Sequence, residues 1–324
     1  MKRAARLVLT HPFLVRAAFS LTHRVAPIFM LHRFRDTEAG DRAHDPRILR
    51  ANLSWLRSNN CSLVSLTELL DRVAEGAPLK RAIAFTVDDG YADFARLAAP
   101  VFAEFDCPVT VFLTTGFVDG REWMWWDKVS VALKALHRQA DAGPMIESLK
   151  RIPESEKLER IDKLVQESGL ELPPAPPSQF APIAWDDVRR LSRSGVTFGP
   201  HTVTHPVLSR TGDEQSRFEI SESWRRVRDE AGEGAVPIFC YPNGEAADFN
   251  VREENAVAAA GMRAALSTRG GYVSHRDFSA DRPRDRFRLP RLSYPDQHLT
   301  FVQAASGIER AKLAVRAAIG QGPS

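Results

Sequence analysis

The chain of 324 residues has few cysteines, little net charge and no long apolar run. Its three cysteines are scattered and odd in number, so a disulfide framework is not expected and a reducing compartment is favoured. Lys and Arg number 44 against 41 Asp and Glu, and a net charge of +3 predicts no nucleic-acid partner. No stretch of about 18 apolar residues is present, so no membrane-spanning helix is expected. The composition, 44% hydrophobic and 26% charged, is that of a globular chain.

Residues 2–20 begin with basic side chains followed by an apolar stretch, which superficially resembles a secretion signal. His11, Pro12 and Arg16 break that stretch, so we expect a cytoplasmic protein. We interpret the segment as a basic amphipathic helix. It either packs on the domain, which we favour, or lies peripherally on an anionic surface at the inner membrane face. In the second case the side chains that enter the membrane are Leu7, Leu14 and Phe19.

Apolar runs alternate with helical spacing along most of the chain. We expect buried strands at 26–32, 82–87, 108–113, 196–199, 236–240, 263–267 and 287–292. We expect helices at 46–58, 66–75, about 91–105, 213–231 and 249–260. Alternating strands and helices favour parallel pairing in an α/β barrel, whose chemistry lies at the carboxyl ends of the strands.

Two segments depart from this alternation. Residues 121–182 open with Trp123, Trp125 and Trp126, continue as a charged helical stretch and close in a proline-rich loop. We interpret them as an insertion in the barrel that the tryptophans attach to the core, and stacking on sugar rings is the alternative. A final helix is expected at about 298–318. The predicted organisation is an N-terminal helix in 1–26, a barrel in 27–297, and a helix with a tail in 298–324.

The strongest motif is Phe85-Thr-Val-Asp-Asp-Gly90, at the end of an apolar run. Asp88 and Asp89 side by side repel each other and lose hydration, and a cation or a shared proton is the usual reason for such a pair. Gly90 permits the sharp turn that brings both carboxylates to the barrel mouth. The alternative is a strand-to-helix turn with an Asp N-cap.

The second motif is a histidine pair, His201 and His205, which also follows a predicted strand. Histidines four residues apart lie on one face of a helical turn and can reach one metal ion, although such pairs also occur at surfaces by chance. Both motifs end strands of one barrel, so we expect them at the same rim. One carboxylate and two imidazoles leave positions open for water and substrate, as in a catalytic metal site.

A third segment, Pro237–Gly244, is an apolar strand that ends in a Pro/Gly turn. Such a turn could aim a backbone N–H at an oxyanion, but taken alone we interpret it as a barrel corner. Together, Asp88-Asp89-Gly90, His201-x-x-x-His205 and Phe-x-Tyr-Pro-x-Gly at 239–244 resemble the polysaccharide deacetylases, the carbohydrate esterase family 4 or NodB-homology group. The resemblance covers about residues 27–115 and 183–295. It implies a distorted (β/α)7 TIM-like barrel and removal of acetyl groups from a GlcNAc-containing glycan.

The resemblance also implies roles for individual residues. Asp89, His201 and His205 would hold a divalent metal, most often zinc in this family. Asp88 would be the general base that takes a proton from the attacking water. The third motif places Asn243 at the N–H donor for the developing oxyanion and Tyr241 where a proline is commoner.

The chain departs from the family pattern at three points. Cys240 occupies the position of an arginine that usually steadies the base, and the later Asp-Trp motif is missing at 267–271. The late Leu-x-His that usually supplies the acid has no histidine here. Arg291, at the end of the last strand, could reach Asp88. His32, at the end of the first strand, either acts as the acid or only caps a core strand.

Three functions fit these observations. The first is metal-dependent N- or O-deacetylation of a glycan or glycan precursor. The second is hydrolysis of another amide or an imide on the same scaffold, since a fold does not fix its substrate. The third is a non-catalytic carbohydrate- or lipid-binding relative that has lost the acid and the arginine.

Overall fold

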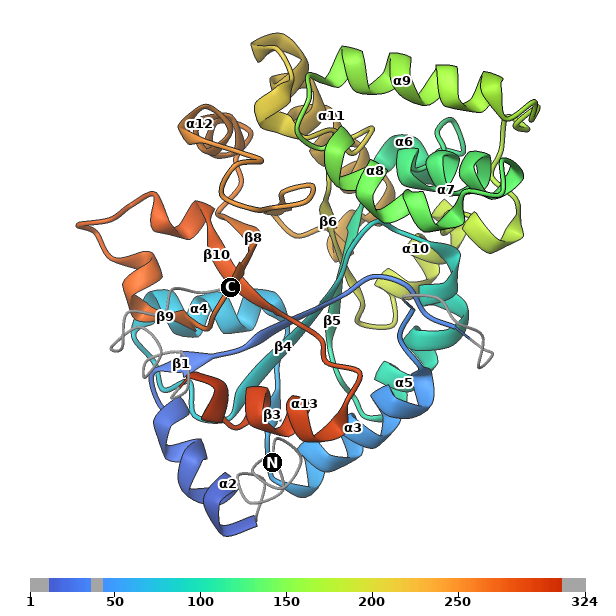
Figure 1. Cartoon of the computed structure of the whole chain (residues 1–324). Helices are drawn as coiled ribbons and strands as arrows, with labels where there is room; N and C mark the ends of the chain where they lie inside the picture. Colours follow the sequence, from blue (N-terminus) through green and yellow to red (C-terminus); the bar gives the residue numbers. More distant parts are fainter. Residues whose placement is uncertain (1–11, 36–42, 311–324) are drawn as a thin grey trace, which may run out of the picture.

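The computed structural model describes residues 12–35 and 43–310, and its centre is a barrel of parallel strands (Figure 1). The strand order is β6-β5-β4-β2-β10-β8-β7, and each of these neighbouring pairs is parallel. A bridge between Phe198 of β6 and Ala235, just before β7, brings the two outer strands together, so the barrel is nearly closed. The predicted α/β barrel with seven parallel strands is confirmed. The strands are β2 (Ile28–Leu31), β4 (Ala82–Val87), β5 (Val109–Leu113), β6 (Thr197–Pro200), β7 (Ile238–Cys240), β8 (Ala264–Gly270) and β10 (Leu289–Ser293).

These runs form strands without polar alternation because both of their faces are covered. In β4, Ala82 and Ala84 pack with residues of the other strands inside the barrel. Ile83, Phe85 and Val87 pack outward into the layer between strands and helices. Successive side chains therefore leave the strand on opposite sides, and both sides are apolar.

Helices surround the barrel and follow the strands in the chain. The helices of the first half are α2 (Pro12–Ala18), α3 (Pro46–Ser58), α4 (Leu66–Glu75), α5 (Ala99–Glu104), α6 (Thr115–Val118), α7 (Trp125–Ala135), α8 (Ala142–Leu149) and α9 (Glu154–Glu167). Those of the second half are α10 (Trp185–Ser192), α11 (Asp213–Ala231), α12 (Val251–Ala259) and α13 (His298–Ala305). Three short strands complete the structure: β1 (Val25–Ala26) pairs antiparallel with β9 (Val273–Ser274), and β3 (Ser62–Leu63) pairs with β4.

Several predicted boundaries are wrong for identifiable reasons. The strand predicted at 26–32 divides at Pro27, which has no N–H for a sheet, into β1 and β2. The helix predicted at about 91–105 is a π-helical turn over Phe94–Ala98 followed by α5. The helix predicted at 298–318 is interrupted after Ala305, where Gly307 has a φ of +84°, and helical residues resume at 308–310. Residues 311–318 lie outside the described residues.

The described part of the N-terminal segment packs on the barrel. Val15, Ala18 and Phe19 are buried in the main hydrophobic cluster, and Phe19 stacks on Trp55 with ring centroids 6.2 Å apart. The favoured interpretation, packing on the domain, therefore agrees with this part of the segment, and the alternative in which Phe19 enters a membrane does not. Leu7 lies outside the described residues. Leu14 is exposed, as is its neighbour Phe13. Among the described residues, no helix is long and apolar enough to cross a bilayer.

Helices α7, α8 and α9 form a group of their own on one side of the barrel (Figure 1, green). Their shared apolar cluster includes Trp125, which is buried. Trp123 is also buried and donates its indole N–H to the carbonyl of Pro173 (2.9 Å). These contacts of Trp123 and Trp125 lie within residues 121–182, so the two tryptophans hold the segment together rather than attach it to the barrel core, and Trp126 has a different position, described below.

Candidate metal centre and active site

Asp89, His201 and His205 converge at the carboxyl ends of β4 and β6. The Nε2 atoms of His201 and His205 lie 3.6 and 3.5 Å from Oδ1 of Asp89. One ligand atom from each residue lies within 4.8 Å of the others, and all three side chains are buried. The two motifs predicted from separate parts of the sequence therefore form one cluster.

The backbone of this cluster is strained. Asp89, Thr202 and His205 have φ angles of +76°, +68° and +57°, in the left-handed region that residues other than glycine rarely adopt. Hydrogen bonds hold the two turns: Thr114 N–H donates to the carbonyl of Asp89, and His205 N–H donates to Oγ1 of Thr202. Strain of this kind persists where the surrounding structure fixes it, and it is concentrated at functional sites.

The orientation of the histidines suits a metal ion. Nδ1 of His201 lies 2.7 Å from the carbonyl oxygen of Cys240. A carbonyl oxygen only accepts, so Nδ1 carries a hydrogen and Nε2 is the atom that faces Asp89. Burial acts to lower the pKa of His201, but its contacts with Cys240 and with the carboxylates of Asp89 and Asp88 raise that pKa well above its ordinary value. Burial, together with repulsion from His201, lowers the pKa of His205 to about 3, so its imidazole is neutral. A carboxylate oxygen and two imidazole Nε2 atoms that converge on it fit a divalent cation, which would replace the proton that His201 otherwise holds.

Asp88 is paired with Arg291 rather than with this cluster. Nη1 and Nη2 of Arg291 donate to Oδ1 and Oδ2 of Asp88, both at 2.8 Å. Arg291 also donates to Thr86 Oγ1 and to the Ser267 carbonyl, and it is fully buried. Burial acts to raise the pKa of Asp88, but the charge and hydrogen bonds of Arg291 lower that pKa well below its usual range. Asp88 is therefore held as a carboxylate.

Cys240 lies beside this ion pair. Its Sγ is 3.5 Å from Oδ2 of Asp88 and 3.1 Å from Nη2 of Arg291. Burial raises the pKa of the thiol, so the side chain is neutral. The resemblance places an arginine at position 240, and here a guanidinium reaches the same carboxylate from β10 instead. The charge partner of Asp88 is thus present, but it comes from a different strand.

His32 lies at the end of β2 beside the same carboxylate. Its Nε2 atom is 3.9 Å from Oδ2 of Asp88, and its side chain is 43% exposed. His32 therefore combines a contact with the buried site and access to solvent, which a group that exchanges protons with water needs.

Asn243 and Tyr241, which follow β7, lie in different surroundings. Asn243 has a φ of +59°, its Nδ2 is buried without a hydrogen-bond partner among the described residues, and its carbonyl accepts from Thr268. Tyr241 points into an apolar cluster and stacks on Phe249, with centroids 3.8 Å apart. Its backbone N–H donates to Leu266. The structure does not bring the Tyr241 side chain to the Asp/His cluster.

Glu219, on α11, was not identified from the sequence. Its Oε2 accepts the backbone N–H groups of Val203 and Thr204, and its Oε1 accepts the hydroxyl of Thr204. This fully buried carboxylate thus holds the turn between His201 and His205. The available signal was its position in the buried stripe of α11, where an amphipathic helix normally has an apolar residue.

Tyr91, Trp126 and Asp127 form a second unpredicted group. The Trp126 indole N–H donates to the Tyr91 hydroxyl (2.9 Å), which donates to Oδ2 of Asp127 (2.7 Å). The Trp126 ring lies against the His205 ring, with centroids 4.7 Å apart. Burial raises the pKa of Asp127 to about 7, and the hydrogen bond from Tyr91 opposes this rise.

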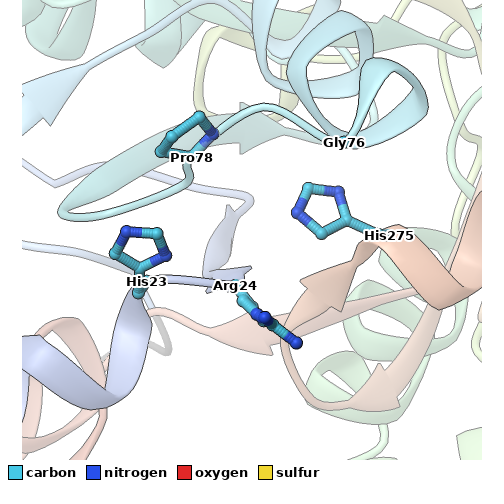
Figure 2. A pocket seen from close by; sticks show the side chains of 5 residues that line it. All are labelled: His23, Arg24, Gly76, Pro78 and His275. Carbon is cyan, nitrogen blue, oxygen red and sulfur yellow. The ribbon is translucent and has the colours of Figure 1, made fainter.

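A pocket of about 260 Å³ lies away from this site, near the amino ends of β2 and β4. Figure 2 shows the side chains of His23, Arg24 and His275 around it. Gly76 and Pro78 complete the lining, and none of these residues belongs to the Asp/His cluster.

Comparisons with known proteins agree with this geometry. A family model described as polysaccharide deacetylase matches residues 75–265, more than half of the chain. Streptococcus pyogenes deacetylase PplD in complex with acetate has 16% identity and a TM-score of 0.59, over 86% of this chain and 98% of that one. IcaB from Ammonifex degensii has 17% identity and a TM-score of 0.58, over 87% and 97% of the two chains.

A de-N-acetylase from Aggregatibacter actinomycetemcomitans has 16% identity and a TM-score of 0.57, over 84% of this chain and 96% of that one. At these identities the three structures show a shared fold. No curated protein matches the sequence.

Proposed function

The chain belongs to the polysaccharide deacetylase family, and on that premise we propose that it is a metal-dependent hydrolase that removes N-acetyl groups from a GlcNAc-containing polysaccharide or glycan precursor. The observation that carries the proposal is the buried Asp89/His201/His205 cluster next to a buried Asp88–Arg291 pair. The relatives described as deacetylases and as a de-N-acetylase support the same reaction class.

Asp89, His201 and His205 would hold the cation, which we propose to be zinc because two imidazoles and one carboxylate are a frequent catalytic zinc set. When bound, such a cation polarises the acetyl carbonyl and makes water a better nucleophile. The left-handed residues and Glu219 hold the backbone turns from which the ligand side chains extend.

Asp88 is proposed as the general base. Arg291 keeps it ionised, and a carboxylate that accepts two hydrogen bonds from a guanidinium still has lone pairs that can take a proton from water. We propose Arg291 as the residue that holds this carboxylate in place. The backbone N–H of Asn243 is proposed to stabilise the oxyanion, and for Tyr241 we propose only a packing role.

His32 is proposed as the general acid that protonates the departing amine, supported by its distance of 3.9 Å from Asp88 and its exposure to solvent. His32→Gln should retain metal and fold but lower kcat, most strongly for substrates with a poor amine leaving group. An acetate ester should be affected less, because its carbonyl is easier to attack. If His32→Gln hydrolyses an acetamide at the wild-type rate, the acid is a different group.

The test combines metal content with acetate release. The metal-loaded protein is screened on acetylated chito-oligomers, peptidoglycan fragments and cyclic imides, with His201→Ala as the matched variant. We expect stoichiometric zinc and acetate release in the wild type, and neither in a folded His201→Ala. Hydrolysis of imides alone would indicate the amide-hydrolase alternative, and sugar binding without hydrolysis would indicate a non-catalytic relative. Unchanged zinc in His201→Ala would place the metal elsewhere.

We propose a cytoplasmic location, and we keep peripheral contact at the inner membrane face as an alternative for the part of residues 2–20 that does not pack on the barrel. All three cysteines are buried and unpaired, and Phe13 and Leu14 present an exposed apolar pair. Cell fractionation tests this proposal. Recovery from outside the cytoplasm of a mature chain cleaved before residue 27 would contradict it.

A further inference from the structure

Residues 123–183, which contain α7, α8 and α9 and are called the α7–α9 segment below, touch both turns that bear the cation ligands. Its last residues pair with the turn after Asp89: Ala92 N–H donates to the carbonyl of Ala181 (2.9 Å), and Ile183 N–H donates to that of Gly90 (2.8 Å). Its first helix, α7, provides Trp126 against His205. In the chain the segment lies between β5 and β6, which are adjacent strands of the barrel. The segment therefore borders the Asp/His cluster.

His201 and His205 are oriented by different means. A hydrogen bond from Nδ1 to the Cys240 carbonyl fixes the ring of His201. Nδ1 of His205 is buried and has no hydrogen-bond partner among the described residues. Apart from the approach of its Nε2 to Asp89, the contacts of the His205 ring are aromatic, with Trp126 at 4.7 Å and 77° and with His201 at 4.8 Å and 77°. Edge-to-face contacts of this kind are favourable and directional.

Trp126 is itself held from two sides. Its indole N–H donates to the Tyr91 hydroxyl, and that hydroxyl donates to Asp127, the next residue of α7. Tyr91 lies two residues after Asp89 and packs edge-on against Phe117. A continuous set of contacts therefore runs from the Asp89 turn, through Trp126, to His205.

We propose that Trp126 is a positioning residue for His205, and that the α7–α9 segment is thereby an integral part of the cation site. The inference rests on the proposed function, since it assigns His205 as a ligand. A ligand ring that is free to rotate must be ordered when the cation binds, and loss of the groups that orient metal ligands typically lowers metal affinity by about 10- to 100-fold.

Trp126→Ala and Trp126→Phe test the proposal, with Trp123→Ala as the matched control. Trp123 belongs to the same segment but donates to Pro173 and lies against the Phe180 ring. Zinc affinity is measured by competition with a chromophoric chelator, and ligand geometry by the visible spectrum of the Co²⁺-loaded protein. We expect Trp126→Ala to lower zinc affinity by about 10-fold or more and to alter the Co²⁺ spectrum. Phe retains a ring against His205, so Trp126→Phe should restore most of the affinity.

Trp123→Ala should lower the melting temperature yet leave zinc affinity and the Co²⁺ spectrum as in the wild type. Equal affinity and spectrum in Trp126→Ala and the wild type would overturn the inference alone. An equal loss of affinity in Trp123→Ala would also overturn it, by assigning the effect to general destabilisation. A wild-type protein that binds no divalent cation would overturn the proposed function as well. If Trp126→Ala does not fold, Trp126→Phe is compared with Trp126→Leu, and equal affinities of those two would refute a role for the ring.

Discussion

At the residue scale, adjacent carboxylates have opposite partners. Asp88 faces a guanidinium from β10, whereas Asp89 faces the Nε2 atoms of two histidines. One backbone step separates them, and the positive φ of Asp89 turns its side chain toward the histidines. Two adjacent carboxylates repel each other unless each has a favourable partner of its own. The different partners of Asp88 and Asp89 therefore support different roles, Asp88 as the base and Asp89 as a cation ligand.

Substitution of each carboxylate separates these roles. Asp88→Asn should retain the cation but lower turnover by about 10²–10⁴-fold, since the amide cannot take a proton. Asp89→Asn should lose the cation. Turnover is measured per cation-loaded molecule, because removing the charge of Asp88 leaves Arg291 buried without its partner and lowers stability. Equal loss of cation in the two variants would contradict the division of roles.

Asp127 predicts a pH dependence of stability. Its pKa is about 7 in the folded protein against an ordinary value of 3.8, so between these pH values the folded state holds a proton that the unfolded state releases. The stability from this group is fully present below about pH 4 and is lost as pH rises through about 7. Asp127→Asn should therefore reduce the decrease in melting temperature between pH 5 and pH 8. Asp229→Asn, which changes an exposed carboxylate, should show the same decrease in melting temperature between pH 5 and pH 8 as the wild type. If Asp127→Asn shows that same decrease too, Asp127 is not the group that causes it.

At the element scale, α11 acts on the cation site through Glu219. The Glu219 side chain reaches from the buried face of the helix to the turn between the two histidines. There it accepts hydrogen bonds from the backbone N–H groups of Val203 and Thr204. A helix packed on β6 thereby fixes the conformation of the turn that follows β6. The left-handed residues Thr202 and His205 are part of that turn, and their strain needs such external support.

Glu219→Ala should destabilise the protein by about 1–3 kcal/mol, because the N–H groups of Val203 and Thr204 lose a charged acceptor. Glu219→Gln keeps one acceptor oxygen and should therefore lower the stability less than Glu219→Ala does. Glu222→Ala, on the same helix, breaks a surface pair with Arg225 and should cost below about 1 kcal/mol. Chemical denaturation measures the free energy of unfolding of all three variants. An equal loss of stability in Glu219→Ala and Glu222→Ala would show that the buried Glu219 carboxylate does not stabilise the turn.

Elements and motifs were predictable from the sequence to different extents. The seven strands and the Asp88, Asp89, His201 and His205 motifs were visible because local apolar runs and fixed spacing specify them. Glu219 and Trp126 were not visible as site residues, since their roles arise from packing between segments far apart in the chain. Gly307 was visible, but nothing local showed that it ends α13. The partner of Asp88 was visible only as a possibility, because Arg291 is 203 residues away and reaches the carboxylate only after the barrel closes.

At the scale of the whole molecule, the cation ligands connect separate parts of the barrel. Asp89 follows β4 and the two histidines follow β6, with β5 between these strands in the sheet. The α7–α9 segment lies in the chain between β5 and β6 and contacts the turns on both sides. Unfolding of any of these parts separates the ligands, so a cation bound here binds the folded state alone.

Cation binding should therefore stabilise the whole molecule. A ligand that binds only the folded state adds about 2.7 kcal/mol when its free concentration is 100 times its Kd. We expect a chelator to lower the melting temperature of the wild-type protein and added Zn²⁺ to restore it. In His201→Ala, neither addition should change the melting temperature, because one of the three ligands is gone. Thermal denaturation with and without chelator measures both proteins. An equal response in His201→Ala would mean that the stabilising cation binds outside the Asp89/His201/His205 cluster, and the assignment of these residues as ligands would then fail together with the catalytic roles that depend on it.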